Sequence, residues 1–134
     1  RTNAETHAVS ERIAFLCGDL FAPLDPAARF EFIACNPPYV TTSECDQLAP
    51  DIRDHEPRIA LDGGSDGLDV IRPLIATAPD HLEPGGSLLC EISPEQAEAV
   101  SQLLARQPAF ESPRIVEDLS GHARVVVASI GPST

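Results

Sequence analysis

Three short apolar runs, at residues 12–17, 30–35 and 87–92, limit most strongly how this chain can fold. Each run is nearly continuous in hydrophobicity and has polar or turn-forming residues at its end, which is typical of strands buried on both faces of a parallel sheet. Between the last two runs, residues 68–78 place apolar side chains three and four positions apart, as a helix does. The alternation predicts an α/β fold with right-handed crossovers.

The rest of the chain is consistent with such a sheet. Residues 93–96 (Ser-Pro-Glu-Gln) form a strong helix start, with Ser as the cap, Pro at the first helical position and Gln at the third. Residues 1–9 read as the tail of a helix. The runs at 110–116 and 124–130 follow one another and predict a closing antiparallel hairpin.

Two further segments are expected to be irregular. Residues 84–86 (Pro-Gly-Gly) predict a turn into the strand that follows, and Asp66 is available to cap the helix over 68–78. Residues 40–67 are polar and rich in Asp, Pro and Gly, so we expect a long loop there. A loop of that length in a compact domain is usually functional or mobile.

Composition excludes several classes of protein. With 134 residues, 43% of them hydrophobic, the chain is expected to be one globular domain. It has no apolar run near the roughly 20 residues that cross a bilayer, so we expect no membrane association and a cytoplasmic location. Nine Arg, without any Lys, stand against 21 Asp and Glu, for a net charge of −12. Such a charge repels phosphate backbones, so no direct contact with nucleic acid is expected.

The four cysteines do not indicate a metal site. They show neither Cys-x-x-Cys pairing nor a histidine at ligand spacing. Cys35 and Cys90 lie inside apolar runs, where a buried reduced thiol is common. We therefore expect no bound metal.

Two chemically distinctive stretches follow predicted strands. The first is residues 18–20 (Gly-Asp-Leu), and the second is residues 36–39 (Asn-Pro-Pro-Tyr). Ligands of α/β sheets bind beyond the carboxyl ends of the strands, so both stretches are candidate site residues.

The Asn-Pro-Pro-Tyr stretch suits the recognition of a planar NH₂ group. Proline has no backbone N–H and holds the preceding residue extended, so the stretch is a rigid edge rich in acceptors: the Asn36 side-chain oxygen and the Pro37 carbonyl. Tyr39 adds a flat apolar face. Acceptors that fix both N–H bonds of an amide or aromatic amine aim its lone pair at an incoming methyl group. If the methyl donor is a sulfonium, catalysis then depends on orientation and electrostatics.

The chain resembles a known enzyme family at these residues. The Asn-Pro-Pro-Tyr stretch resembles the acceptor motif of S-adenosylmethionine-dependent amino-methyltransferases. The loop at 52–68, with its His-Glu-Pro and Ala-Leu-Asp-Gly-Gly sequences, resembles that of peptide-chain release-factor glutamine N5-methyltransferases. The resemblance covers nearly the whole chain. It implies a Rossmann-like class I fold, S-adenosylmethionine as cofactor, and release factors with a Gly-Gly-Gln motif as protein substrates.

The resemblance also implies roles for individual residues. Asn36 would bind the glutamine amide and lie beside the donor methyl, the Pro37 carbonyl would be the second acceptor, and Pro38 would hold the loop. Tyr39 would pack on the substrate. Asp19 and Leu20, in the Gly-Asp-Leu stretch, would bind the adenine of the cofactor. The Asp19 carboxylate would accept a hydrogen bond from the exocyclic amine, and Leu20 would cover the ring. For His55 and Glu56, a loop packed on itself is favoured over substrate contact.

The chain departs from the family in what it lacks. The family's first two strands are missing, together with the acidic-x-Gly-x-Gly turn that follows the first of them and the N-terminal helical recognition domain. The family's strand order, 3-2-1-4-5-7-6, puts the two missing strands between 12–17 and 30–35. Residues 1–134 are therefore expected to be the acceptor-side part of a catalytic domain, with a strand at 12–17 that has no neighbour and two open sheet edges.

Three other functions stay open at this point. The related enzymes that methylate a ribosomal-protein glutamine have a similar loop, usually with a different sequence at 61–64. Methylation of a nucleobase would use the same way of holding an amine, although the negative charge disfavours it. A non-catalytic fragment that binds a partner is the third alternative, which the missing glycine turn favours and the intact Asn-Pro-Pro-Tyr stretch disfavours.

Overall fold

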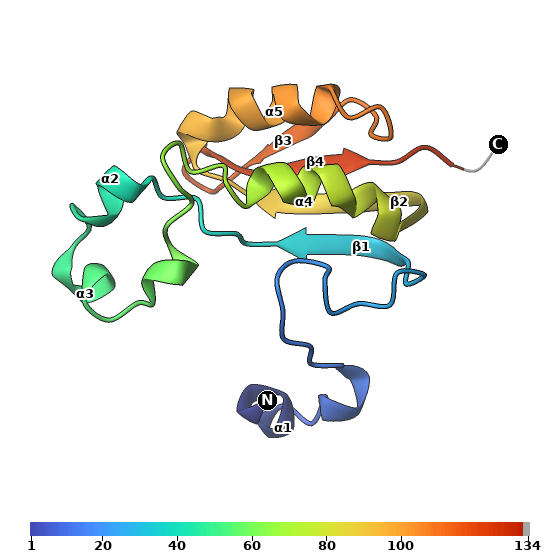
Figure 1. Ribbon diagram of the computed structural model, residues 1–134, viewed down its shortest axis with the longest axis horizontal. Coiled ribbons are helices and arrows are strands. Elements are labelled where there is room, and N and C mark those ends of the chain that lie inside the picture. The colour runs from blue at the N-terminus through green and yellow to red at the C-terminus, as the bar shows by residue number, and fades with distance from the viewer. Residues whose placement is uncertain (133–134) are drawn as a thin grey trace.

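A computed structural model describes residues 1–132, and its centre is a four-stranded mixed sheet (Figure 1). The strand order is β1-β2-β4-β3. The first pair is parallel, and the other two pairs are antiparallel. The order corresponds to 4-5-7-6 of the order implied by the resemblance. The strands are β1 (Phe30–Cys35), β2 (Leu82–Glu91), β3 (Arg114–Glu117) and β4 (Ala123–Ser129).

Two helices share one hydrophobic core with the sheet. They are α4 (Ile71–Thr77), which continues as a 3₁₀ turn over Ala78–His81, and α5 (Ala97–Ala105). The core takes alternate residues from the strands, because side chains two apart on a strand point to the same face. Its fully buried members include Leu88 and Cys90 from β2 and Val126 from β4. The predicted α/β class and the closing hairpin are confirmed.

The predicted start of α5 is also confirmed. Ser93 and Gln96 form a reciprocal capping box, and a 3₁₀ turn over Pro94–Gln96 leads into the helix. The predicted apolar stripe buries Val100 and Leu104 completely. The helix is therefore fixed at its first turn by local hydrogen bonds and along its length by burial.

Residues 12–17 do not form the predicted strand. The chain begins with α1 (Thr2–Thr6) and a 3₁₀ turn over Ser10–Arg12, and 13–17 then run without a strand partner in the part of the chain that is described. Figure 1 shows this segment leaving the sheet below β1. A strand needs a neighbour for its N–H and C=O groups, and β1 is the edge of the sheet. Leu16 and Phe32 consequently stay 58% and 68% exposed.

Three smaller predictions need correction. Residues 40–67 are not a plain loop, because they contain α2 (Thr42–Cys45), α3 (Pro50–Arg53) and a 3₁₀ turn over Arg58–Ala60. The Pro-Gly-Gly turn at 84–86 lies inside β2, beside a shift in its register with β1. Asp66 does not cap α4; its carboxylate accepts from the Leu68 N–H, and α4 begins after Val70 without a side-chain cap.

Residues 40–67 project from the carboxyl ends of β1 and β2 (Figure 1). A parallel bridge between Val40 and Asp62 brings the two ends of this segment together. No helix within residues 1–132 has the length and hydrophobicity to cross a membrane.

Candidate active site

The Asn-Pro-Pro-Tyr stretch, residues 36–39, directly follows β1, and we call it the acceptor edge. Asn36 is exposed, and Pro37 is buried beneath it. Neither the Asn36 side chain nor the Pro37 carbonyl forms a hydrogen bond with another of residues 1–132. Two acceptor oxygens at the carboxyl end of β1 therefore remain available to a ligand.

Tyr39 is held in place from its hydroxyl end. Its hydroxyl donates to Oε1 of Glu91, the last residue of β2, at 3.0 Å. Partial burial raises the pKa of the Tyr39 phenol above its usual value, and the hydrogen bond and charge of Glu91 raise it further, while Arg124 opposes them. The phenol stays neutral at physiological pH, and its ring is oriented by a carboxylate on the neighbouring strand.

Glycines let the end of the 40–67 segment approach the acceptor edge backbone to backbone. A Cβ on Gly63 would lie 2.6 Å from the Pro38 carbonyl oxygen, and one on Gly67 would lie 2.3 Å from that of Tyr39. The Gly63 N–H donates to the Val40 carbonyl at 2.8 Å. A side chain at either glycine would push the segment off the acceptor edge, which gives a physical reason for glycine at positions 63 and 67.

One buried polar side chain, that of Gln96, completes this contact. It is 7% exposed, and its Nε2 donates to the Tyr39 carbonyl at 3.0 Å and the Gly67 carbonyl at 3.1 Å. Sequence reasoning identified Gln96 only as a capping residue. The signal for more was its place at the carboxyl end of β2, on the same edge of the sheet as the acceptor residues.

The rest of the 40–67 segment is braced by Arg58 rather than by the His-Glu pair. The Arg58 guanidinium contacts Asp46 at 2.8 Å and Asp62 at 3.1 Å. Hydrogen bonds from Thr42 and from the Gly64 N–H, with the Arg58 contact, lower the pKa of the Asp62 carboxyl. His55 and Glu56 are exposed, so the expected packing of these two residues within the loop is not seen.

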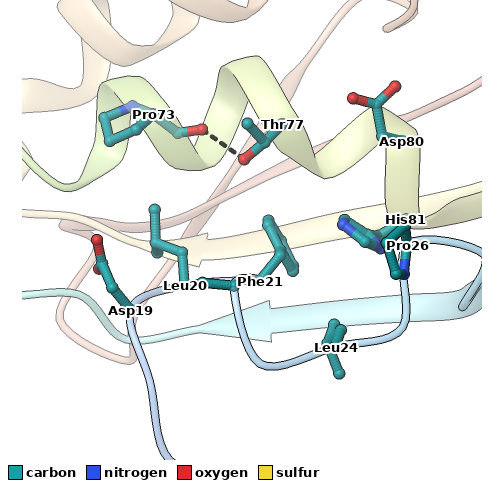
Figure 2. Close-up of a pocket in the computed structure, with 10 residues that line it drawn as sticks. Asp19, Leu20, Phe21, Leu24, Pro26, Pro73, Thr77, Asp80 and His81 are labelled. Carbon is teal, nitrogen blue, oxygen red and sulfur yellow. Dashed lines mark hydrogen bonds between the residues drawn. The ribbon is translucent and has the colours of Figure 1, made fainter.

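Asp19 and Leu20 line a cavity of about 400 Å³, which the acceptor edge does not line. Figure 2 shows the loop from Asp19 passing beneath α4, with Leu20 and Phe21 directed toward the helix. Leu20 has φ of +44°, a left-handed conformation that is costly for a branched side chain and that is often found at functional sites. Phe21 stacks on His81, with ring centroids 4.7 Å apart.

The structure does not join the two groups of predicted residues into one cavity. None of the four residues of the acceptor edge lines the cavity of Asp19 and Leu20. Tyr39 instead lines a second cavity of about 370 Å³, between the start of the 40–67 segment and the start of α5, which also carries Glu44 and Glu95. The acceptor edge thus contributes Tyr39 to the second cavity and no residue to the cavity of Asp19 and Leu20.

The residues present fit one end of S-adenosylmethionine. The cavity of Asp19 and Leu20 offers a carboxylate acceptor beside an apolar wall, as a purine ring with an exocyclic amine requires. The 134 residues contain no acidic-x-Gly-x-Gly turn for the remainder of the cofactor. Residues 1–132 also bring no three His, Cys, Asp or Glu side chains together at a possible metal site.

Curated proteins are similar to this chain over almost its whole length. It is 46% identical over 125 residues to a release factor glutamine methyltransferase from Gloeobacter violaceus, covering 93% of the chain and 43% of the relative. It is 43% identical over 129 residues to that of Geobacter sulfurreducens, covering 96% of the chain and 44% of the relative. The chain thus spans less than half the length of these relatives. No family model matches it.

A further relative carries a different substrate in its name. A ribosomal protein uL3 glutamine methyltransferase from Bradyrhizobium diazoefficiens is 48% identical over 90 residues, covering 67% of the chain and 28% of the relative. The identity is comparable, but the similarity covers less of the chain.

Solved structures share the fold. A complex of Mtq2 and Trm112 from E. cuniculi, described as responsible for methylation of the termination factor eRF1, matches 96% of the chain and 68% of its own with a TM-score of 0.56 and 18% identity. A methyltransferase from Pyrococcus furiosus matches 79% of the chain and 43% of its own with a TM-score of 0.50 and 15% identity. The described sheet and its helices therefore have a methyltransferase fold.

Proposed function

Because this chain belongs to the release factor glutamine methyltransferase family, we propose that it forms the acceptor side of an enzyme that methylates N5 of a glutamine. The substrate is the glutamine of the Gly-Gly-Gln motif of a release factor. Residues 1–134 are part of the catalytic domain, and the glycine-rich donor segment and the recognition domain come from the rest of the enzyme. The exposed Phe32 on β1 and the unpaired segment at 13–17 support this division.

The acceptor edge is suited to holding the glutamine amide. The Asn36 side-chain oxygen and the Pro37 carbonyl each accept one of its two N–H bonds, which aims the nitrogen lone pair away from the edge. Tyr39 packs on the amide with its ring oriented by Glu91. An amide nitrogen is a poor nucleophile because its lone pair is delocalised, so fixed orientation is the main contribution that these residues make.

Asp19 and Leu20 hold the cofactor at its adenine, by a hydrogen bond to the exocyclic amine and by apolar cover. When bound, S-adenosylmethionine supplies an electrophilic methyl group on a sulfonium. The chemistry needs no strong base, because the amide nitrogen becomes strongly acidic once it is methylated and its extra proton can pass to water. The neutral Tyr39 phenol agrees with a site that orients its substrate rather than deprotonating it.

One observation carries the proposal: Asn36 is exposed at the end of β1 and its side chain is not engaged by residues 1–132. A structural asparagine after a strand would be expected to hydrogen-bond its own turn. An exposed amide beside a carbonyl with no protein donor is arranged for a ligand.

The test compares Asn36→Ala with Asn3→Ala in the complete enzyme. Loss of one pre-organised hydrogen-bonding group should lower kcat by about 10²-fold. Because Asn36 is exposed, the free energy of unfolding should change by no more than about 0.5 kcal/mol. Asn3 is exposed on α1 and serves as the matched control. Equal activity of the two variants would remove Asn36 from the mechanism.

The substrate is tested separately. The complete enzyme is supplied with a release factor, with ribosomal protein uL3 and with an adenine-containing oligonucleotide, and transfer of labelled methyl is measured. The coverage of 92–98% by the release-factor relatives, against 67% by the uL3 relative, supports the release factor. Preferred methylation of uL3 or of the oligonucleotide would refute that choice.

A further inference from the structure

Gln96 forms more hydrogen bonds than its capping role requires. In the capping box, the Gln96 side-chain oxygen accepts from the Ser93 N–H at 3.1 Å. That contact fixes the start of the helix and uses only Oε1. The amide nitrogen is left over, and it donates to the carbonyls of Tyr39 and Gly67, with a longer contact of 3.5 Å to the Asp66 carbonyl.

These two carbonyls belong to the two backbone segments that form the acceptor side of the site. The Tyr39 carbonyl is the last group of the acceptor edge, and the Gly67 carbonyl ends the 40–67 segment. Without a donor between them the two carbonyl oxygens would face a common buried space, which is unfavourable because each would lose its hydrogen bond to water. Gly67 makes room for that donor, since a Cβ there would lie 2.3 Å from Nε2.

The backbone contacts around Gln96 close the same junction. The Val40 N–H donates to the Leu61 carbonyl at 3.0 Å, and the Asp69 N–H donates to the Gly63 carbonyl at 2.9 Å. Val40 directly follows Tyr39, and Asp69 lies two residues after Gly67, so both donors are close in sequence to the residues that Gln96 contacts. Tyr39 is therefore fixed at both ends, at its hydroxyl by Glu91 and at its carbonyl by Gln96.

We propose that Gln96 is a positioning residue of the methyl-transfer site: its amide N–H groups lock the acceptor edge to the end of the 40–67 segment and so set the position of Asn36 and Tyr39. The inference rests on the proposed function for its effect on catalysis. The lock itself is a property of the fold and can be measured without the reaction.

The variant Gln96→Glu separates the lock from the cap. Glutamate is as good as glutamine at this position of a capping box, so the helix start is kept. The carboxylate has no N–H to donate and faces two carbonyl oxygens. Gln96→Met removes the donors without placing a charge, together with the capping oxygen, and is used if the first variant does not fold. Gln102→Glu is the matched control, because Gln102 lies exposed on α5 and its side chain donates a hydrogen bond to Glu98. The new carboxylate beside Glu98 should cost no more than about 0.5 kcal/mol.

Two measurements are made on the complete enzyme. The first is amide hydrogen exchange, in which the amides of Val40, Gly63 and Asp69 should exchange at least about tenfold faster in Gln96→Glu, with those of β2 and β4 unchanged. The second is steady-state methylation of a release factor. A positioning role lowers kcat by about tenfold or more, and leaves the Kd for S-adenosylhomocysteine within about twofold of wild type.

The outcomes separate the positioning role of Gln96 from the proposed methyltransferase function. Faster exchange with a lower kcat, and neither in Gln102→Glu, supports the positioning role. Unchanged exchange overturns it, and so does faster exchange with an unchanged kcat. A wild-type enzyme that does not methylate release factors refutes the proposed function, and the exchange experiment then decides the lock alone: accelerated exchange supports it and unchanged exchange overturns it.

Discussion

Gly67 offers the sharpest test of how the acceptor edge is held. Its φ is +73°, and a Cβ would lie 2.3 Å from both the Tyr39 carbonyl oxygen and Gln96 Nε2. The change Gly67→Ala therefore introduces two costs: a left-handed backbone for a residue with a Cβ, and an overlap that must move the Tyr39 carbonyl or the buried Gln96 amide and so break their hydrogen bond. Gly121 has almost the same φ, +79°, with nothing within 4 Å of its Cβ position.

The two variants differ only in the second cost. A left-handed conformation costs about 1–2 kcal/mol for an alanine, so Gly121→Ala should lower the free energy of unfolding by that amount. Displacing Gln96 leaves buried polar groups unsatisfied, at a further cost of about 1–3 kcal/mol. Gly67→Ala should consequently lose about 2–5 kcal/mol, and the difference of about 1–3 kcal/mol measures the packing between the 40–67 segment and the acceptor edge.

The assay is urea unfolding at equilibrium, followed by circular dichroism and by the fluorescence of Tyr39, the single tyrosine of the chain. Coincident transitions justify a two-state treatment. If the two variants lose equal stability, to within about 0.5 kcal/mol, the close approach at Gly67 does not stabilise the fold and the reasoning about Gln96 fails with it.

Three further outcomes are expected. Burial, then the charges of Cys35 and Glu91, raise the pKa of the Cys90 thiol from 9.0 to about 12. Because the unfolded thiol then ionises first, stability falls as pH rises above 9, by up to about 1.4 kcal/mol per pH unit, and urea unfolding at pH 8–10 should show a shallower fall in Cys90→Ala. Tyr39→Phe should lose about 0.5–1.5 kcal/mol of stability with the Glu91 hydrogen bond, and an equal stability at pH 7 would contradict that contact. Phe32→Lys should reduce self-association of the 134-residue chain in sedimentation velocity, since Phe32 is an exposed aromatic on an edge strand, whereas the exposed Ile59→Lys should not.

The sheet could be predicted from sequence wherever an element finds its partner within the chain. Residues 30–35 and 87–92 became neighbouring parallel strands, and Val100 and Leu104 became core, because each apolar run has an apolar surface to meet. Residues 12–17 have the same pattern without such a surface. The hydrophobic pattern predicts which face of a strand is buried if the strand forms. The hydrogen bonds that define a strand come from a neighbouring strand, and the pattern of one segment does not show whether such a neighbour exists.

The sequence suggests the residues of the proposed site more directly than it suggests the contacts that support them. Asn36, Pro37 and Tyr39 were singled out because the properties of proline and asparagine follow from their own covalent structure, and their roles stay predictions. The support depends on distances between segments far apart in the chain: Gly63 and Gly67 on the acceptor-edge carbonyls, Gln96 between Tyr39 and Gly67, and Glu91 on the Tyr39 hydroxyl.

A glycine in a sequence signals that a side chain is not tolerated, but it does not say what would collide with one. In this chain a Cβ on Gly67 would collide with the carbonyl of Tyr39, a residue that binds substrate in our proposal. The donor to that carbonyl is Gln96, whose sequence pattern was already explained by its role as a helix cap. A capping glutamine is expected to use its oxygen, so sequence alone leaves its nitrogen undecided. The fold assigns that nitrogen to the site, because the carboxyl ends of β1 and β2 bring the start of α5 against the acceptor edge.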